Sequence, residues 1–161
     1  IAIERQGPVA LALTRQNLPI LDPESTQVRE GTLRGAYTLA DAEGDLQIVL
    51  IATGSEVALA LDAREALQAQ GIGARVVSMP CMEIFAEQPS HYIDAVLPAG
   101  VPKLSIEAGI TLGWERWTGC QGNSIGLDRF GASAPGDEVF EKLGFTVENV
   151  VKRATAIVQG E

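Results

Sequence analysis

The segment "LQIVLIATGSEVALALDAREALQAQG", residues 46–71, joins a strongly apolar run to a helical pattern through a glycine and a serine. The run at 46–53 is rich in Ile, Val and Leu, which is typical of a strand buried on both faces. From Glu56 to Gln70 the apolar residues recur on one face of a helix. Ser55 is expected to be the N-cap of this helix and Gly71 its C-terminal stop.

The alternation of strand and helix patterns continues downstream. Two further apolar runs, "ARVVSM" at 74–79 and "PKLSIEA" at 102–108, predict buried strands, and residues 81–97 between them predict two short helices. This βαβαβ order favours an α/β fold with a mostly parallel sheet, right-handed crossovers and helices on both faces. The remaining pattern predicts a short strand and a loop at 122–131 and helices at 136–143 and 146–158.

The first 35 residues have a different character. Val9 to Leu13 form a run that predicts a buried strand, yet no strand pattern stands beside it. Residues 19–35 are polar, contain two prolines and show no sustained periodicity, so we interpret them as a linker. We therefore expect the tail of one domain, residues 1–35, joined to the whole of the next, residues 36–161.

Composition and charge exclude several classes of protein. Of the 161 residues, 46% are hydrophobic and 20% charged, which predicts a soluble globular domain, and the formal net charge is -9. A nucleic acid or an anionic membrane is not an expected partner, because both are bound by clustered Lys and Arg. No run is long enough to span a bilayer, and no signal peptide is recognised. The two cysteines, Cys81 and Cys120, predict partly buried free thiols in a reduced, cytosolic setting without a zinc site.

Ligands of open α/β sheets bind beyond the carboxyl ends of the strands, and one candidate there is the turn "IATGSEV". Gly54 leads into a helix N-terminus whose amides could hold a small anion. The turn matches neither G-x-G-x-x-G nor a P-loop, and Glu56 would repel a phosphate. A nucleotide site is therefore disfavoured here.

Four other candidates follow from residue type and position. Glu107 ends a predicted strand and could act as an acid or base, but a buried acid satisfied by backbone N–H groups or an arginine is the favoured interpretation. His91 has no recognisable catalytic partner and is expected to be a half-exposed helix residue. Trp114 and Trp117 should pack against the core or a partner. The glycine-rich residues 118–137 predict tight turns and close backbone approaches, possible features of an interface.

The last candidate is Arg15, which follows the predicted strand and is followed by Gln16 and Asn17. Its guanidinium offers a planar fork of donors suited to a carboxylate or a phosphate. From chemistry alone, a salt bridge to a protein carboxylate and a site for an anionic ligand are equally supported.

Five stretches in order give the sequence a resemblance to the C-terminal end of the transketolases. They are "GPVALALTRQNLP", "IATGSEVALA", "ARVVSMPCMEIF", "SIEAG" and "FGASAPGDEVFEKLGFTVENVV". The resemblance implies that residues 36–161 form the family's C-terminal domain, a three-layer α/β fold whose five-stranded sheet has four parallel strands and one antiparallel strand. It also implies that Val9–Leu13 is the last strand of the preceding pyrimidine-binding domain.

The resemblance further implies a function for the intact enzyme. Transketolases are cytoplasmic homodimers of the pentose phosphate pathway and the Calvin cycle that move a two-carbon ketol unit between sugar phosphates. They use thiamine diphosphate and Mg²⁺ or Ca²⁺. Arg15 matches the family arginine that contacts the substrate phosphate. The cofactor, metal and catalytic residues of the family lie upstream, so no catalytic, cofactor-binding or metal-binding residue is expected in this chain, which should be inactive alone and serve structure and assembly.

Two alternatives remain open at this point. The E1 components of 2-oxo acid dehydrogenases end in a similar domain, although "TRQNLP" argues against them. The chain could instead be a stand-alone regulatory module that binds a small anion at the "TGSE" turn.

Overall fold

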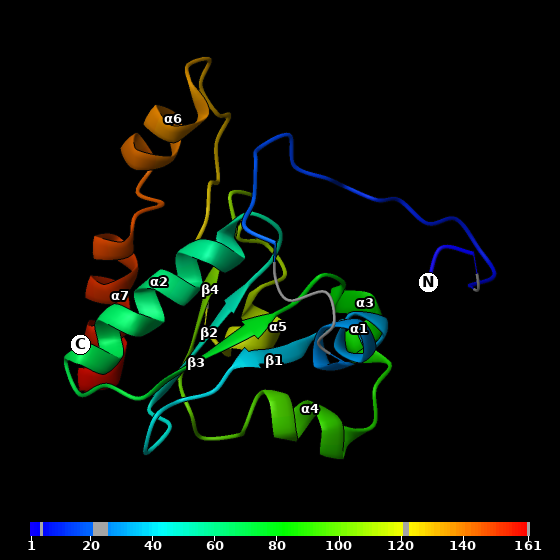
Figure 1. The fold of residues 1–161 in the computed structure, drawn as a ribbon, viewed down its shortest axis with the longest axis horizontal. Helices are drawn as coiled ribbons and strands as arrows, with labels where there is room; N and C mark the ends of the chain where they lie inside the picture. The colour runs from blue at the N-terminus through cyan, green and yellow to red at the C-terminus, as the bar shows by residue number, and fades with distance from the viewer. Residues whose placement is uncertain (4, 21–25, 121–122, 161) are drawn as a thin grey trace.

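The computed structural model describes residues 1–3, 5–20, 26–120 and 123–160. Parts of the predicted linker (21–25) and of the glycine-rich segment (121–122) lie outside the described residues. The rest forms an α/β body from which the N-terminal segment extends away (Figure 1). Among the described helices, none has the length and apolar content needed to cross a bilayer.

A single five-stranded sheet lies at the centre of the fold, in the order β1-β3-β2-β4-β5. Its strands are β1 (Tyr37–Ala40), β2 (Ile48–Ala52), β3 (Ala74–Ser78), β4 (Lys103–Ile106) and β5 (Ser124–Ile125). Strand β1 runs antiparallel to β3, and all other neighbouring pairs are parallel. The expected sheet with four parallel strands and one antiparallel strand is confirmed.

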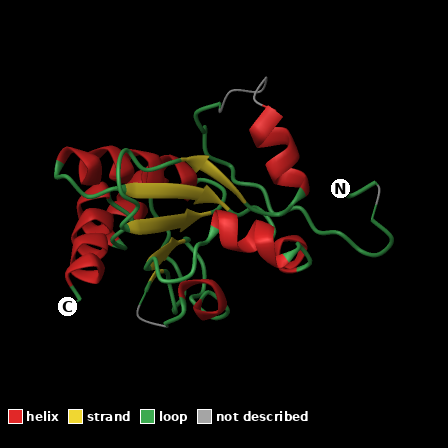
Figure 2. Cartoon of the chain, turned by 90° about the horizontal axis from the view of Figure 1, so that it is seen from below, coloured by secondary structure: helices red, strands yellow, loops and turns green. Residues whose placement is uncertain are grey.

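Helices cover both faces of the sheet, as Figure 2 shows. The helices are α1 (Thr26–Leu33), α2 (Glu56–Ala69), α3 (Met82–Ala86), α4 (Ser90–Val96), α5 (Glu115–Thr118), α6 (Gly136–Lys142) and α7 (Val147–Gln159). Helices α2 and α7 pack on one face, whereas α3, α4 and α5 contribute to the core on the other. The three-layer prediction is therefore confirmed.

Strand β2 explains why the decisive run is almost continuously apolar. Ile48, Leu50 and Ala52 belong to the core under α2 and α7, and the alternate residues Val49 and Ile51 belong to the core on the opposite face. All five side chains are fully buried. A central parallel strand covered on both faces has no solvent side on which a polar residue could lie.

Both ends of helix α2 lie where the sequence predicts them, but only the C-terminal end is capped as expected. Gly71 adopts a left-handed φ of 80° and donates its amide to Gln68, while Ile72 donates to Leu67, which together form a Schellman motif. At the other end, the Ser55 side chain makes no capping hydrogen bond. Its hydroxyl donates to the Glu56 carboxylate instead, so Ser55 occupies the predicted N-cap position without a capping bond from its side chain.

Two predictions for the N-terminal region are wrong for this structure. Residues 9–13 form no strand in the described part of the chain, and the side chains of Val9, Leu11 and Leu13 are exposed. A strand needs a neighbour to satisfy its backbone, and this chain supplies none there. Within the predicted linker, residues 26–33 form helix α1, whose contact with β1 compensates for its weak apolar pattern.

Candidate functional site

The carboxyl ends of the neighbouring strands β2 and β4 are joined through the side chain of Glu56. This residue begins α2 and is only 5% exposed. Its Oε1 atom accepts a hydrogen bond of 2.5 Å from the Ser55 hydroxyl, and its Oε2 atom accepts one of 3.2 Å from the backbone N–H of Ala108. Glu56 thus ties the turn after β2 to the turn after β4.

Burial raises the pKa of the Glu56 carboxyl above its ordinary value, and the negative charge of Glu107 raises it further. The hydrogen bonds from Ser55 and Ala108 act in the opposite direction. An environment that already disfavours one negative charge also disfavours a bound anion.

Two amides at the start of α2 already have acceptors within the protein. The Glu56 amide donates to Thr53 and the Val57 amide to Gly54. An anion at this point would have to displace those bonds and lie beside a buried carboxyl. The geometry therefore gives no support to an anion site at Gly54.

Glu107, at the end of β4, is half-buried and accepts a hydrogen bond of 2.7 Å from the indole Nε1–H of Trp114. The sequence predicted backbone N–H groups or an arginine as its partner, so that choice of donor was wrong. Trp114 is 2% exposed and Trp117 is 8% exposed. The ring of Trp117 lies 5.0 Å from that of Phe85, and both tryptophans belong to the core under α3, α4 and α5, as predicted.

The loops after β4 and β5 are fastened to each other, a feature that the sequence reasoning missed. Asp128 accepts hydrogen bonds of 2.8 Å from both the backbone N–H and the hydroxyl of Thr111. The amide of Leu127 donates to the carbonyl oxygen of Gly109 at 2.7 Å. We call residues 107–113 and 126–131 together the double loop. No sequence signal links Thr111 to Asp128, because their pairing depends on the parallel register of β4 and β5.

Arg15 is exposed and makes no ion pair or hydrogen bond with another residue in the described part of the chain. Its neighbours are ordered locally: the Thr14 hydroxyl donates to the Gln16 side-chain oxygen at 3.0 Å, and the Gln16 amide donates to the Thr14 hydroxyl at 3.3 Å. A few residues further on, Leu18 and Pro19 line a hollow with Gly54 and Ser55. The segment after Arg15 therefore reaches the carboxyl edge of the sheet.

The other candidates gain no partner for chemistry. His91 is exposed on α4. Cys81 is partly buried and its thiol donates to Glu83 at 3.4 Å, whereas Cys120 is exposed, which corrects the prediction of two partly buried thiols. Within the described ranges, no three His, Cys, Asp or Glu side chains lie together in a way that could hold a metal ion.

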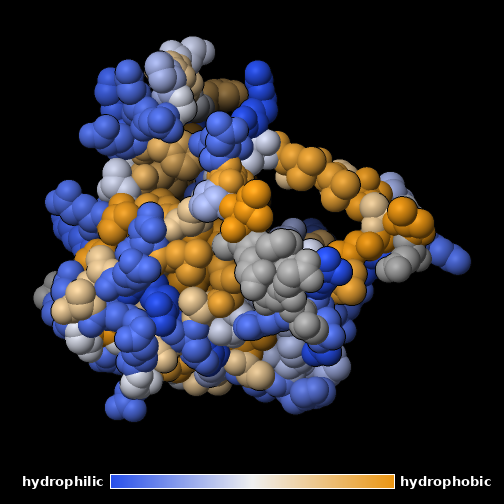
Figure 3. All heavy atoms as spheres, viewed as in Figure 1, coloured by the Kyte–Doolittle hydropathy of each residue, from blue (hydrophilic) through white to orange (hydrophobic). Residues whose placement is uncertain are grey.

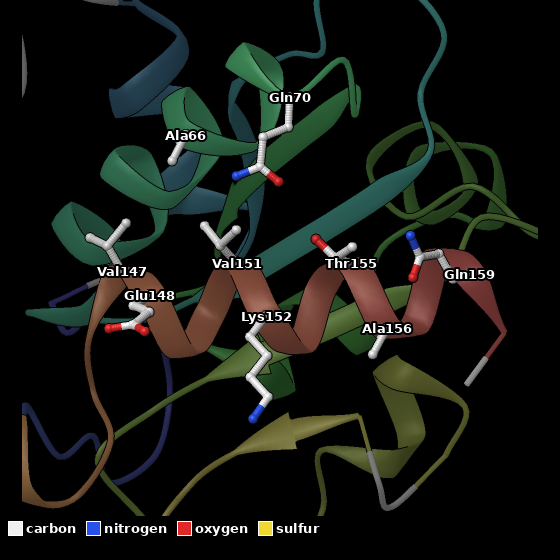
Figure 4. A pocket seen from close by; sticks show the side chains of 9 residues that line it. All are labelled: Ala66, Gln70, Val147, Glu148, Val151, Lys152, Thr155, Ala156 and Gln159. Carbon is white, nitrogen blue, oxygen red and sulfur yellow. The ribbon is translucent and has the colours of Figure 1, made fainter.

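Another hollow lies between α2 and α7. Figure 4 shows Val147, Val151 and Thr155 pointing from α7 toward α2, while Lys152 points away. The Thr155 hydroxyl oxygen is buried without a hydrogen-bond partner in the described structure. The hollow brings no pair of catalytic groups together.

Comparisons with known proteins agree with the architecture. Residues 35–146 match the family model described as "Transketolase-like TK C-terminal domain". Transketolase from Streptococcus pyogenes serotype M6 is 51% identical over 150 residues, which cover 92% of this chain and 21% of that protein. Transketolase from Halalkalibacterium halodurans is 47% identical over 163 residues, which cover 100% of this chain and 24% of the relative.

The fold is also similar to that of a solved transketolase structure. The crystal structure of transketolase in complex with sedoheptulose 7-phosphate from Pichia stipitis superposes with a TM-score of 0.82 at 43% identity. The match covers 91% of this chain and 21% of the other. The chain thus spans between a fifth and a quarter of the length of the relatives that it matches.

The sheet order, the two helical layers and the linked carboxyl edge define a three-layer α/β domain. The family model matches more than half of the residues of this chain, which identifies the family as well as the fold. This chain belongs to the transketolase C-terminal domain family.

Proposed function

We propose that this chain is the C-terminal part of a longer polypeptide, the parent enzyme, that acts as a transketolase. The observation that carries the proposal is the match of nearly the whole chain to proteins named transketolase at 47–51% identity. The parent enzyme transfers a two-carbon ketol unit between sugar phosphates. Bound thiamine diphosphate, with Mg²⁺ or Ca²⁺, supplies the carbanion stabilisation for this transfer.

The residues of this chain fit a supporting role in that enzyme. The groups joined at the carboxyl edge, Glu56 and Glu107, are held by Ser55, Ala108 and Trp114, which supports a structural task for them. Cofactor and metal binding are assigned to the upstream domains, with the boundary near residue 35. We also propose that the parent enzyme is a cytoplasmic homodimer and that the chain alone is inactive.

Arg15 is proposed to bind the phosphate of the sugar substrate. Its guanidinium is exposed and has no ion pair within the described structure, so its donors are available to an anion. Residues 14 and 16 fix the turn around it through their mutual hydrogen bonds. A substrate phosphate could accept two parallel N–H bonds from this side chain.

The replacement Arg15→Ala in the parent enzyme tests this role. Loss of a charge-assisted hydrogen bond worth about 1.5–3 kcal/mol should raise KM for phosphorylated sugars about 10–150-fold. The phosphate is remote from the reacting carbonyl, so kcat should change much less. The matched control is an unphosphorylated ketol donor, whose KM should stay the same. Equal losses with both donors would refute a phosphate contact.

The mass of the natural polypeptide tests the proposed fragment itself. Because the chain spans 21–24% of its relatives, the parent should be about four to five times heavier than 17.0 kDa. A natural product of 17.0 kDa would make the stand-alone binding module the better explanation. Turnover of 2-oxo acids in place of ketose phosphates would assign the parent to the dehydrogenase E1 components.

A further inference from the structure

The double loop exposes large apolar side chains although its backbone is tightly held. Ile110 is 61% exposed, Leu112 is 74% exposed and Phe130 is 96% exposed. Single apolar residues on a surface are common. Three large ones on two loops that are hydrogen-bonded to each other form a more specific feature, because exposed apolar side chains in one region of a surface often mark an interaction site.

The hydrogen bonds and close contacts of the double loop favour one arrangement of its backbone. Thr111 and Asp128 are joined twice, and Leu127 is bonded to Gly109. A Cβ atom on Gly126 would come within 2.6 Å of the Thr111 methyl group and 2.9 Å of the Gly109 carbonyl oxygen. The two loops therefore approach too closely at this point for a side chain. Such preorganisation lowers the entropy cost of binding a partner.

We propose that the double loop is the surface against which the preceding part of the same polypeptide packs. This inference rests on the proposed function, because it requires the parent enzyme. It goes further by naming the residues that form the contact: Ile110, Leu112 and Phe130, held in place by Thr111 and Asp128.

The N-terminal segment supports this choice of partner. It carries its own exposed apolar residues, Leu11 and Leu13 among them, and Figure 3 shows apolar side chains gathered along its length. The same segment reaches the carboxyl edge of the sheet at Leu18 and Pro19. The start of the segment, at Ile1, lines a hollow with Pro80 and Cys81, which follow the carboxyl end of β3. A body that precedes the segment is therefore tethered on the carboxyl side of the sheet, the side from which the double loop also extends, at high effective concentration.

A second copy of this chain fits the observations less well. The net charge of -9 on 161 residues opposes association of identical chains through repulsion at neutral pH. The relatives, in contrast, contain more than three quarters of their length outside the matched region.

Hydroxyl-radical footprinting of two phenylalanines tests the proposal. Phe130 is 96% exposed and Phe145 is 5% exposed, so they provide an exposed and a buried reference of the same residue type. In the 161-residue chain, Phe130 should be oxidised much faster than Phe145. In the parent enzyme, the oxidation rate of Phe130 should fall about tenfold toward that of Phe145. An unchanged rate at Phe130 in an active parent enzyme would overturn this inference and leave the proposed function standing.

A photo-crosslinker placed at position 130 identifies the covering body. Parent enzyme reassembled from isotopically light and heavy subunits distinguishes crosslinks within one polypeptide from crosslinks between two. Crosslinks to upstream residues of the same polypeptide are expected. Crosslinks between subunits would overturn the proposed occupant. If the natural polypeptide proves to have no upstream part, the proposed function fails first, which a mass measurement alone reveals.

A variant gives an independent measurement. Phe130 is almost fully exposed in the chain, so Phe130→Ser should leave the urea unfolding of the 161-residue chain unchanged. In the parent enzyme, the same replacement should increase the rate of proteolytic cleavage between the upstream part and residue 35 several-fold. An unchanged cleavage rate would argue against a contact at Phe130.

Discussion

At the scale of single residues, Glu56 connects two turns that are 52 positions apart in the sequence. Its carboxyl receives hydrogen bonds from a side chain next to it and from a backbone amide beyond β4. Burial raises the pKa of this carboxyl above its ordinary value of 4.5. The residue is therefore more favourable to the fold when protonated, and its contribution depends on pH.

This dependence can be measured with Glu56→Gln. Between pH 4.5 and the higher pKa of the folded state, the folded chain binds a proton that the unfolded chain lacks. The contribution of Glu56 to the free energy of unfolding is therefore complete below pH 4.5 and is lost as the pH rises through the folded-state pKa. Urea unfolding from pH 4.5 to 8 should show a smaller decline for the glutamine variant than for the wild type. Parallel curves would contradict the assignment.

The bond between Trp114 and Glu107 allows a comparison of two tryptophans. Trp114→Phe removes the indole donor and leaves the Glu107 oxygen without its partner, whereas Trp117→Phe removes a ring of the same size from the same core. Both tryptophans are less than a tenth exposed. We expect Trp114→Phe to cost about 1–3 kcal/mol more in the free energy of unfolding than Trp117→Phe. Equal costs would show that only the volume of the ring matters.

At the scale of elements, two glycines with similar backbone angles have different surroundings. Gly71 ends α2 with a φ of 80° and has open space where a Cβ atom would lie. Gly35 joins α1 to β1 with a φ of 85°, and a Cβ atom there would overlap the carbonyl oxygen of Cys81 and the amide of Phe85. One position thus requires only a left-handed backbone, and the other also requires the absence of a side chain.

The two alanine variants should therefore differ in the free energy of unfolding. Gly71→Ala should cost about 1–2 kcal/mol, which is the strain of a left-handed residue with a Cβ atom. Gly35→Ala should cost more than about 4 kcal/mol, because α1 and the start of α3 must also move apart. Denaturant midpoints and slopes for both variants measure this difference. Similar midpoints would mean that the close approach at Gly35 relaxes easily.

Elements with a strong and self-sufficient pattern could be predicted from the sequence. The run at 46–53 became β2 and the periodic segment after it became α2. Elements that depend on distant partners could not be predicted equally well. Residues 9–13 have the composition of a strand but form none, because this chain supplies no neighbouring strand for them. Helix α1 has a weak apolar pattern and is stabilised by its contact with β1.

In the candidate site, too, the features that depend on local sequence could be predicted, whereas those that depend on distant partners could not. The position of Glu107 at a strand end and the packing of Trp114 followed from local patterns, but the bond between them did not. The pairing of Asp128 with Thr111 is a consequence of the register of β4 and β5, which a single sequence does not encode visibly. The anion site suggested at Gly54 has no support, because the buried Glu56 lies there.

At the scale of the whole molecule, the core is independent of the N-terminal segment. The buried apolar residues of the described structure begin at Ala36, and the exposed ion pair between Arg5 and Glu87 contributes little. Trypsin should therefore cut after the exposed Arg15 and leave a body whose Tm changes by no more than about 4 °C. Calorimetry of the trimmed chain measures this. A much larger fall would place the N-terminal segment in the cooperative core.

Helix α7 has a consequence for biosynthesis. It is the last of the described helices along the chain, yet its residues Val150 and Ala154 are fully buried in the core that covers one face of the sheet. During translation, which adds about 5–20 residues per second, the strands and α2 emerge before the helix that completes this face. A nascent chain thus leaves part of this apolar face uncovered until α7 has been synthesised. A nonsense codon anywhere upstream of Val147 would make that exposure permanent and turn the product into a substrate for chaperones and proteases.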